Sequence, residues 1–267
     1  MENNEAKKKK DVRINSEGKV LPGGLMNSPI LKDNLIYKEA SAASSTIHEL
    51  LQHVRLQGLD WVPESFGIDS NGKHVLSYIE GIVPHDMPDW IWDDSILRDV
   101  AVRLRQWHDA TSNFKYQQAK WLLENNEVDE VICHNDIAPY NCVFKDKKLA
   151  GFIDFDLCSP GSRIWDIAYS AYRFVPLLPT EEPERYFEIS PFSKETMLNR
   201  LRSFLEEYSC GDRKFFYSEK SVIKKAQERL QALADWSKNY GLKTKNKEVM
   251  KNAEMYSLHA KWLQNLL

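Results

Sequence analysis

The first eighty residues alternate short apolar runs with polar turns, a pattern typical of short strands. Asn71-Gly72, between two such runs, is a strong hairpin signal. One longer segment, Ser45–Gln57, instead repeats its apolar residues at helical spacing and is followed by Gly58. The pattern therefore predicts a small sheet that carries a single helix. The predicted strands are Val12–Ile14, Lys19–Leu21, Ile30–Leu31, Leu35–Lys38, Glu64–Ile68 and His74–Ile79.

The rest of the chain is dominated by the spacing of amphipathic helices. Residues 131–153 are the exception, because their short apolar runs predict a loop followed by a hairpin. Gly241 is expected to end the helix predicted over Ser218–Asn239. The predicted helices are Asp94–Asp109, Ser193–Tyr208, Ser218–Asn239 and Asn246–Leu267. We therefore expect an α+β chain with a disordered tail (1–10), a β-rich N-terminal lobe (11–80) and a larger, mostly helical C-terminal lobe (81–267).

Composition narrows the class of protein. The 267 residues are 42% hydrophobic and 28% charged, as in ordinary globular proteins. The net charge of −3 supplies no basic field for nucleic acid or a membrane surface, and no run of 18 apolar residues could span a bilayer. The polar start lacks the apolar core of a secretory signal, and the four cysteines form no CxxC pair. We expect a cytoplasmic protein without nucleic-acid or membrane partners.

The residues that carry chemistry gather between 131 and 166. His134 and Asp136 form an HxD pair, Asn141 follows, and Asp154 comes directly after an apolar run. Phosphoryl transfer needs an acceptor hydroxyl held in line and a divalent metal on the phosphates. A loop carboxylate such as Asp136 can orient the hydroxyl and take its proton, while Asn141 and Asp154 offer the oxygen ligands that Mg²⁺ prefers. The predicted hairpin would bring these two metal ligands to the same end of paired strands.

Three segments in this order, HNDIAPYN, FIDFD and GSRIWDIAY, resemble the aminoglycoside phosphotransferase and choline kinase family of small-molecule kinases. The resemblance is strongest over 131–173 and, more weakly, covers most of the chain. It implies a bilobal protein-kinase-like fold, with Asp136 as catalytic base and Asn141 and Asp154 as Mg²⁺ ligands. Asp166 would brace the backbone of the catalytic loop. We expect His134 to pack beneath that loop as a structural residue.

The same resemblance implies that the small lobe covers ATP or GTP. Lys38 matches the phosphate-binding lysine, and Ser77 and Ile79 lie in a segment similar to the hinge that contacts the purine. Asn27 and Ser28 follow Gly23-Gly24 in a loop that either approaches the phosphates or is a plain turn.

The acidic partner of Lys38 stays open at this stage. Glu49 is a candidate on the following helix, but Thr46 and Glu49 also fit a capping box, and His48 is the neighbouring residue. Asp156 either adds a carboxylate beside the metal or is an exposed turn residue.

The acceptor is expected to be small, because the short segment from Asp154 to Asp166 leaves no platform for docking a protein. The stretch from Glu80 to Asp99 is acidic and contains Trp90 and Trp92. It either favours a cationic acceptor, such as an aminoglycoside or a quaternary amine, or is a solvated face.

Other functions remain open beside the aminoglycoside phosphotransferase-like activity. One is a choline, ethanolamine or sugar kinase. Another is a catalytically weak binding or immunity protein on a kinase scaffold. A zinc protein using Cys133, His134 and Cys142 would lack a fourth ligand at usable spacing. No protein partner is evident from the sequence.

Overall fold

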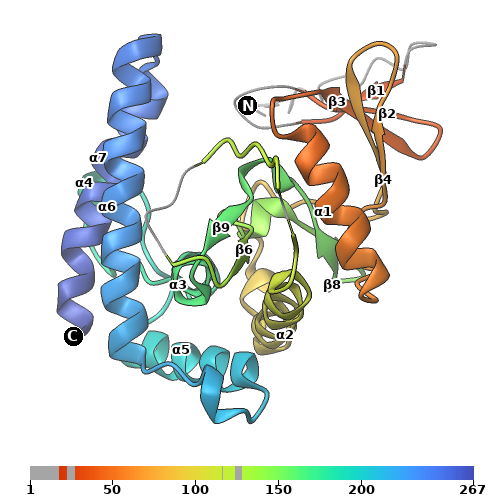
Figure 1. Cartoon of the computed structure of the whole chain (residues 1–267). Coiled ribbons are helices and arrows are strands. Elements are labelled where there is room, and N and C mark those ends of the chain that lie inside the picture. Colours follow the sequence, from red (N-terminus) through yellow and green to blue (C-terminus); the bar gives the residue numbers. More distant parts are fainter. Residues whose placement is uncertain (1–17, 23–27, 116, 124–127) are drawn as a thin grey trace, which may run out of the picture.

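The computed structural model describes residues 18–22, 28–115, 117–123 and 128–267 (Figure 1). The predicted tail, the strand Val12–Ile14 and Asn27 lie outside the described residues.

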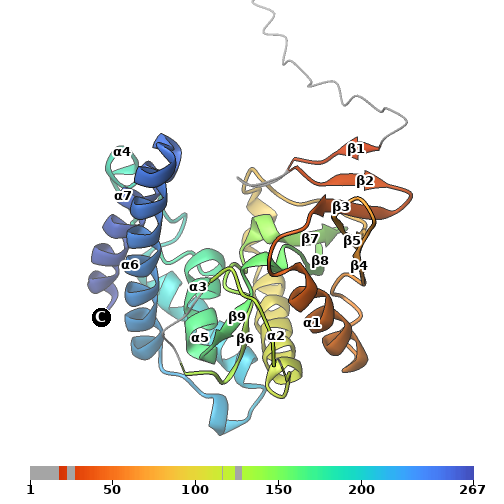
Figure 2. The same ribbon diagram turned by 45° about the horizontal axis from the view of Figure 1, so that its top comes forward.

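The small lobe is built on one antiparallel sheet of five strands in the order β1-β2-β3-β5-β4, with α1 alongside (Figure 2). Its strands are β1 (Lys19–Val20), β2 (Ile30–Lys32), β3 (Leu35–Glu39), β4 (Ser65–Ile68) and β5 (Lys73–Ser77). The turn between β4 and β5 forms as predicted, because Gly72 takes a φ of 76° and Asp69 accepts two backbone hydrogen bonds through its side chain. The five other predicted strands are thus present, with small shifts of their ends.

Helix α1 (Ser44–Leu56) connects β3 to β4 and buries Ile47, Leu50 and Leu51. The capping box is not formed: the residue that caps the helix is Ala43, without a side-chain bond. Thr46 lies inside the helix, where its hydroxyl accepts from the backbone N–H of Lys120. Glu49 is therefore not fixed at the helix start, and its side chain is exposed.

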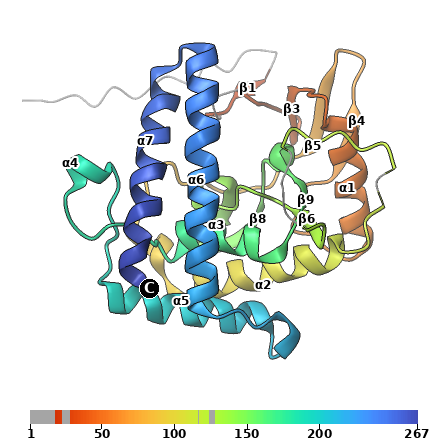
Figure 3. The same cartoon turned by 60° about the vertical axis from the view of Figure 1, so that its left-hand side comes forward.

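The large lobe is mostly helical, and Figure 3 shows its last two long helices, α6 and α7, side by side in front of the other elements. The helices of this lobe are α2 (Asp94–Thr111), α3 (Arg163–Phe174), α4 (Pro183–Tyr186), α5 (Lys194–Ser209), α6 (Glu219–Thr244) and α7 (Lys247–Trp262). Short 3-10 turns are η1 (Asp89–Trp92), η2 (Pro139–Asn141), η3 (Phe155–Leu157), η4 (Arg213–Phe215) and η5 (Leu263–Leu266). One continuous apolar core joins α1 of the small lobe to these helices.

The expected stop at Gly241 is wrong. Helix α6 continues to Thr244 and ends where Lys245 adopts a left-handed φ of 55°. Gly241 is needed for close packing: a Cβ atom there would lie 2.6 Å from Met250 Cγ on α7. The glycine thus lets α7 fold back against α6, a tertiary requirement that looks like a stop signal in the sequence.

Two short strand pairs hold the segment with the predicted chemistry. Strand β6 (Val131–Cys133) pairs with β9 (Ser159–Gly161), and β7 (Cys142–Lys145) pairs with β8 (Lys148–Phe152) in the predicted hairpin. The connector from the small lobe joins this hairpin, because Ile82 and Phe144 exchange two backbone hydrogen bonds. The turn η3, which follows the hairpin, contacts α1 and β3 of the small lobe. Within the described part of the chain, no helix is long and apolar enough to cross a membrane.

Candidate active site

Asp136 lies on the loop between β6 and η2, and both of its carboxylate oxygens accept hydrogen bonds. Asn141 Nδ2 donates to Oδ2 at 2.7 Å and to the backbone oxygen of Asp136 at 2.9 Å, and the Tyr140 hydroxyl donates to Oδ1 at 3.1 Å. Burial and the nearby charge of Asp154 raise the pKa of Asp136 from 3.8 to about 6, although the hydroxyls of Tyr140 and Tyr169 act in the opposite direction. A carboxylate with this pKa is suited to accept a proton near neutral pH.

A group of tyrosines surrounds this carboxylate, and the sequence analysis missed it. The hydroxyls of Tyr140 and Tyr169 lie 2.8 Å apart. Arg173 lies over the ring of Tyr140, 5.4 Å from its centroid, and pairs with Glu188 at 3.0 Å. Burial raises the pKa of both Tyr140 and Tyr169 well above 10, so both remain neutral donors. Their positions inside APYN and WDIAY were the available signal, but nothing in the sequence showed that the two segments meet.

The β7–β8 hairpin brings the two predicted metal ligands together. Ile153 donates its backbone N–H to Asn141 O at 2.9 Å. Asp154 is the next residue and therefore lies beside Asn141 at the end of the hairpin. The amide nitrogen of Asn141 is bonded to Asp136, which leaves its oxygen for a cation. The side chain of Asp154 is 52% exposed and its backbone is left-handed, with φ 62°. These oxygen donors fit Mg²⁺.

Lys38 extends from β3 toward the same turn. Its Nζ donates to Asp156 Oδ1 at 2.6 Å and lies 3.7 Å from Asp154 Oδ1. Asp156 is therefore not an exposed turn residue, since its side chain is only 28% exposed and has a direct ion-pair partner. Neither expected group on α1 pairs with the lysine: Glu49 is exposed, and His48 is bonded to the Ser65 hydroxyl at 2.9 Å.

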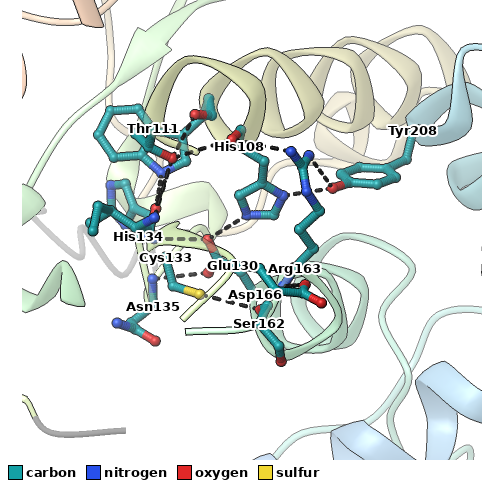
Figure 4. A network of polar contacts seen from close by, with 12 residues as sticks. His108, Thr111, Glu130, Cys133, His134, Asn135, Ser162, Arg163, Asp166 and Tyr208 are labelled. Atoms are coloured by element: carbon teal, nitrogen blue, oxygen red, sulfur yellow. Dashed lines mark hydrogen bonds and ion pairs between the residues drawn. The ribbon is translucent and has the colours of Figure 1, made fainter. Parts of the chain in front are cut away.

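The backbone of the loop that carries Asp136 is held by Asp166 on α3 (Figure 4). Its carboxylate accepts from the backbone N–H groups of His134, at 2.7 Å, and Asn135, at 2.9 Å. Asn135 has a left-handed φ of 68°, so the loop turns sharply at this residue. The side chain of Asn135 secures the turn by donating to Leu157 O and Ser159 Oγ. This is the geometry that the bracing role requires.

A buried polar chain continues from Asp166 through α2 to α5 (Figure 4). His108 lies 3.2 Å from Asp166 through Nε2 and 2.7 Å from the Tyr208 hydroxyl through Nδ1, and Arg163 donates to that hydroxyl at 3.3 Å. Burial lowers the pKa of His108, so the ring is neutral. Burial alone would raise the pKa of Asp166, but the bonds from His108 and His134 hold it below 3.8. Neutral His108 thus donates to Asp166 and accepts from Tyr208.

Residues 74–191 match the phosphotransferase enzyme family. The resemblance to the aminoglycoside phosphotransferase and choline kinase family is confirmed. The matched segment contains the hinge-like region, the catalytic loop, both carboxylates of the FIDFD motif and α3.

Solved structures of this family share the fold over nearly the whole chain. An aminoglycoside 2'-phosphotransferase in complex with GDP has a TM-score of 0.62 at 13% identity and covers 94% of this chain and 93% of its own. A Plasmodium vivax ethanolamine kinase has a TM-score of 0.61 at 12% identity and covers 92% and 83%. A choline kinase from Streptococcus pneumoniae has a TM-score of 0.56 at 17% identity and covers 92% and 94%. The bilobal protein-kinase-like fold is therefore confirmed.

One curated relative is named as an immunity protein and not as a kinase. A trifolitoxin immunity protein of Rhizobium leguminosarum bv. trifolii is 29% identical over 172 residues, which are 62% of this chain and 65% of that protein. The chain thus spans just under two thirds of the length of this relative.

The residues predicted to contact the nucleotide lie in or beside the sheet of the small lobe. Ser77 lies at the end of β5 and donates its backbone N–H to Glu64 O at 2.8 Å. Ile79 is half-buried in the connector after β5, and Ser28 is exposed just before β2. Purine contacts through the backbone groups of Ser77 and Ile79 both remain predictions.

The zinc alternative has no support from the side chains that it needs. The Cys133 thiol donates to Ser162 O at 3.3 Å, and His134 Nε2 lies 3.1 Å from Ile153 O. Burial raises the pKa of the Cys142 thiol well above 9, which disfavours a thiolate. Among the described residues, no three His, Cys, Asp or Glu side chains are grouped to hold a metal.

Only part of the acidic stretch at the start of the large lobe takes part in packing, because Asp86, Asp89, Asp93 and Asp99 are exposed. Asp94 pairs with Arg200 of α5 at 2.7 Å. Trp90 and Trp92 make edge contacts with Phe144 and Phe192, respectively. These contacts hold η1 against the large lobe. The aromatic side chain that is bonded to Asp136 is that of Tyr140 instead.

Proposed function

We propose that this chain is a small-molecule kinase that transfers the γ-phosphate of ATP or GTP to a hydroxyl group. The observation that carries the proposal is Asp136, whose carboxylate is fixed by Asn141 and Tyr140 and lies close enough to Asp154 for the two charges to interact. Its raised pKa suits a group that must gain a proton during the reaction. The shared fold of the aminoglycoside, choline and ethanolamine kinases supports this class of reaction.

In the proposed reaction, Asp136 accepts the proton of the acceptor hydroxyl and orients its oxygen toward the phosphate. Lys38 contacts the phosphates from above, and Asn141 and Asp154 would hold Mg²⁺, which neutralises charge on the phosphate oxygens. Asp166 keeps the loop in place by binding its backbone. The acceptor is proposed to lie beside Tyr140, whose hydroxyl is bonded to the base.

Two arguments support a small, soluble and cationic acceptor. The chain has a net charge of −3, and the stretch that follows the hinge-like segment carries the exposed carboxylates of Asp86, Asp89, Asp93 and Asp99. A panel of aminoglycosides, choline, ethanolamine and neutral sugars, incubated with ATP or GTP and Mg²⁺ at low and high salt, tests this point. A cationic acceptor should show a KM that rises with salt more than kcat changes, because salt screens the attraction. A neutral sugar as sole substrate, with a KM insensitive to salt, would contradict the cationic acceptor alone.

Replacing Asp136 by Ala tests the assignment of the base. Turnover should fall by about 10²- to 10⁴-fold, the usual contribution of a general base, while nucleotide binding stays nearly intact. Turnover equal to that of the unmodified chain would exclude Asp136 as the base.

A second candidate function is a binding protein that confers immunity without efficient phosphoryl transfer. It is favoured by the relative named as an immunity protein, which aligns over 172 residues. Calorimetric titration with MgATP, followed by a turnover assay on the panel, separates the two. Nucleotide binding with turnover supports the kinase, whereas no binding and no turnover on any acceptor favours the immunity function.

A further inference from the structure

Lys38 and Asp156 form a contact between the two lobes, and this contact does not involve helix α1. The lysine belongs to β3 of the small lobe, and the aspartate lies 118 positions later in η3 of the large lobe. Their side chains are 13% and 28% exposed, and Nζ and Oδ1 are 2.6 Å apart. An ion pair this short and this protected from water fixes the direction of the ammonium group.

Helix α1 is fastened to the sheet by a different set of groups. The Ser65 hydroxyl of β4 lies 2.9 Å from His48 Nδ1 and 2.8 Å from His74 Nε2. His74 is fully buried and stands opposite Lys38 in the β3–β5 register. Burial and the charge of Lys38 lower the pKa of His74 to about 4, so the ring is a neutral hydrogen-bonding group. The helix is thus held without an ion pair to Lys38, and Glu49 points to solvent.

We propose that Asp156 is the positioning residue for Lys38 in phosphate binding. This inference rests on the proposed kinase function. Asp156 holds the ammonium group from the large lobe, so Lys38 is correctly placed for the phosphates only when β3 and η3 approach each other. Asp154, at 3.7 Å, is the more exposed of the two carboxylates and remains for the cation. The task that the sequence suggested for Glu49 is therefore done by a residue of the metal-bearing loop.

A double-mutant cycle in thermal unfolding tests the pair without any nucleotide. Asp156→Ala should lower Tm by about 2 to 4 °C, as expected for loss of a partly buried ion pair in a chain of this size. In the Lys38→Met background the same change should have little effect. Glu49→Ala is the matched control, and its shift should be the same in both backgrounds. Equal shifts from Asp156→Ala in the two backgrounds would overturn the pairing.

Kinetics then test the positioning role. With an acceptor from the panel, Asp156→Ala should lower kcat by about tenfold or more while the Mg²⁺ concentration for half-maximal rate changes less than about twofold. Asp156→Glu should restore part of the rate, and Glu49→Ala should leave it unchanged. A large rise in the Mg²⁺ requirement of Asp156→Ala, or a loss of rate in Glu49→Ala alone, would refute the proposal. If the unmodified chain binds no nucleotide, the kinase function fails, whereas the thermal cycle still reports on the pair.

Discussion

Asp136 should destabilise the folded chain at neutral pH, and replacing it with Asn should therefore raise stability while removing activity. Its folded pKa of about 6 lies above the ordinary value of 3.8, because burial and Asp154 disfavour the charged carboxylate. The folded state consequently binds the proton more tightly than the unfolded state does. Stability contributed by the protonated group is present below pH 3.8, is lost as the pH rises to about 6, and stays lost above that.

The size of the effect follows from the difference between these two pKa values. At 1.36 kcal/mol per pH unit, it corresponds to about 3 kcal/mol of unfavourable free energy at pH 8. Asp136 is partly exposed, and an Asn side chain cannot accept hydrogen bonds from Tyr140 and Asn141 through two oxygens. We therefore expect Asp136→Asn to gain about 1 to 2 kcal/mol at pH 8, or roughly 2 to 8 °C in Tm.

Urea unfolding of both chains between pH 3.5 and pH 8 is the appropriate assay. The free energies of unfolding should converge near pH 3.5 and separate as the pH rises through 4 to 6. Asp86→Asn, which removes an exposed carboxylate, is the control for a general change in net charge. If Asp136→Asn is no more stable than the unmodified chain at pH 8, or if both show the same pH dependence, Asp136 does not carry this energetic cost.

Three further predictions follow from the site. The rate should fall as the pH is lowered through about 6. Tyr140→Phe should move this midpoint upward, because the phenol hydrogen bond stabilises the charged form of Asp136. A pH–rate profile that does not move would contradict this role of Tyr140. Asn141→Ala and Asp154→Ala should both raise the Mg²⁺ concentration for half-maximal rate, Asp154→Ala more because it removes a charge, and an unchanged Mg²⁺ titration of Asp154→Ala would exclude it as a ligand. Tyr208→Phe leaves the buried Nδ1 of His108 without its hydrogen-bond donor, so it should cost about 1 to 3 kcal/mol of stability and lower kcat severalfold at constant nucleotide KM. Tyr217→Phe is the control, because the ring of Tyr217 lies next to that of Tyr208. Equal effects of the two substitutions would reject a specific link from Tyr208 to the loop.

The order of elements could be predicted from local patterns. The Asn71-Gly72 turn, the apolar face of α1 and the stripes of α2 and α5 are all short-range features, so their positions agree with the structure within small shifts. Gly241 shows where a local rule fails. Glycine is common after helices because it has no Cβ atom, and the same property admits Met250 at close range inside a helix pair. The sequence alone does not distinguish the two uses.

The sequence by itself determined the candidate base and metal ligands, because Asp136, Asn141 and Asp154 are joined by one loop and one hairpin whose geometry is local. Only the tertiary structure decided the partners of that loop. Asp156 meets Lys38, Tyr140 meets Tyr169, and His108 meets Asp166, and each contact joins elements far apart in the chain. Such contacts depend on how the two lobes and the helices α2, α3 and α5 pack together. A polar residue in a linear pattern carries no sign of which distant group will satisfy it, so packing alone assigns these roles.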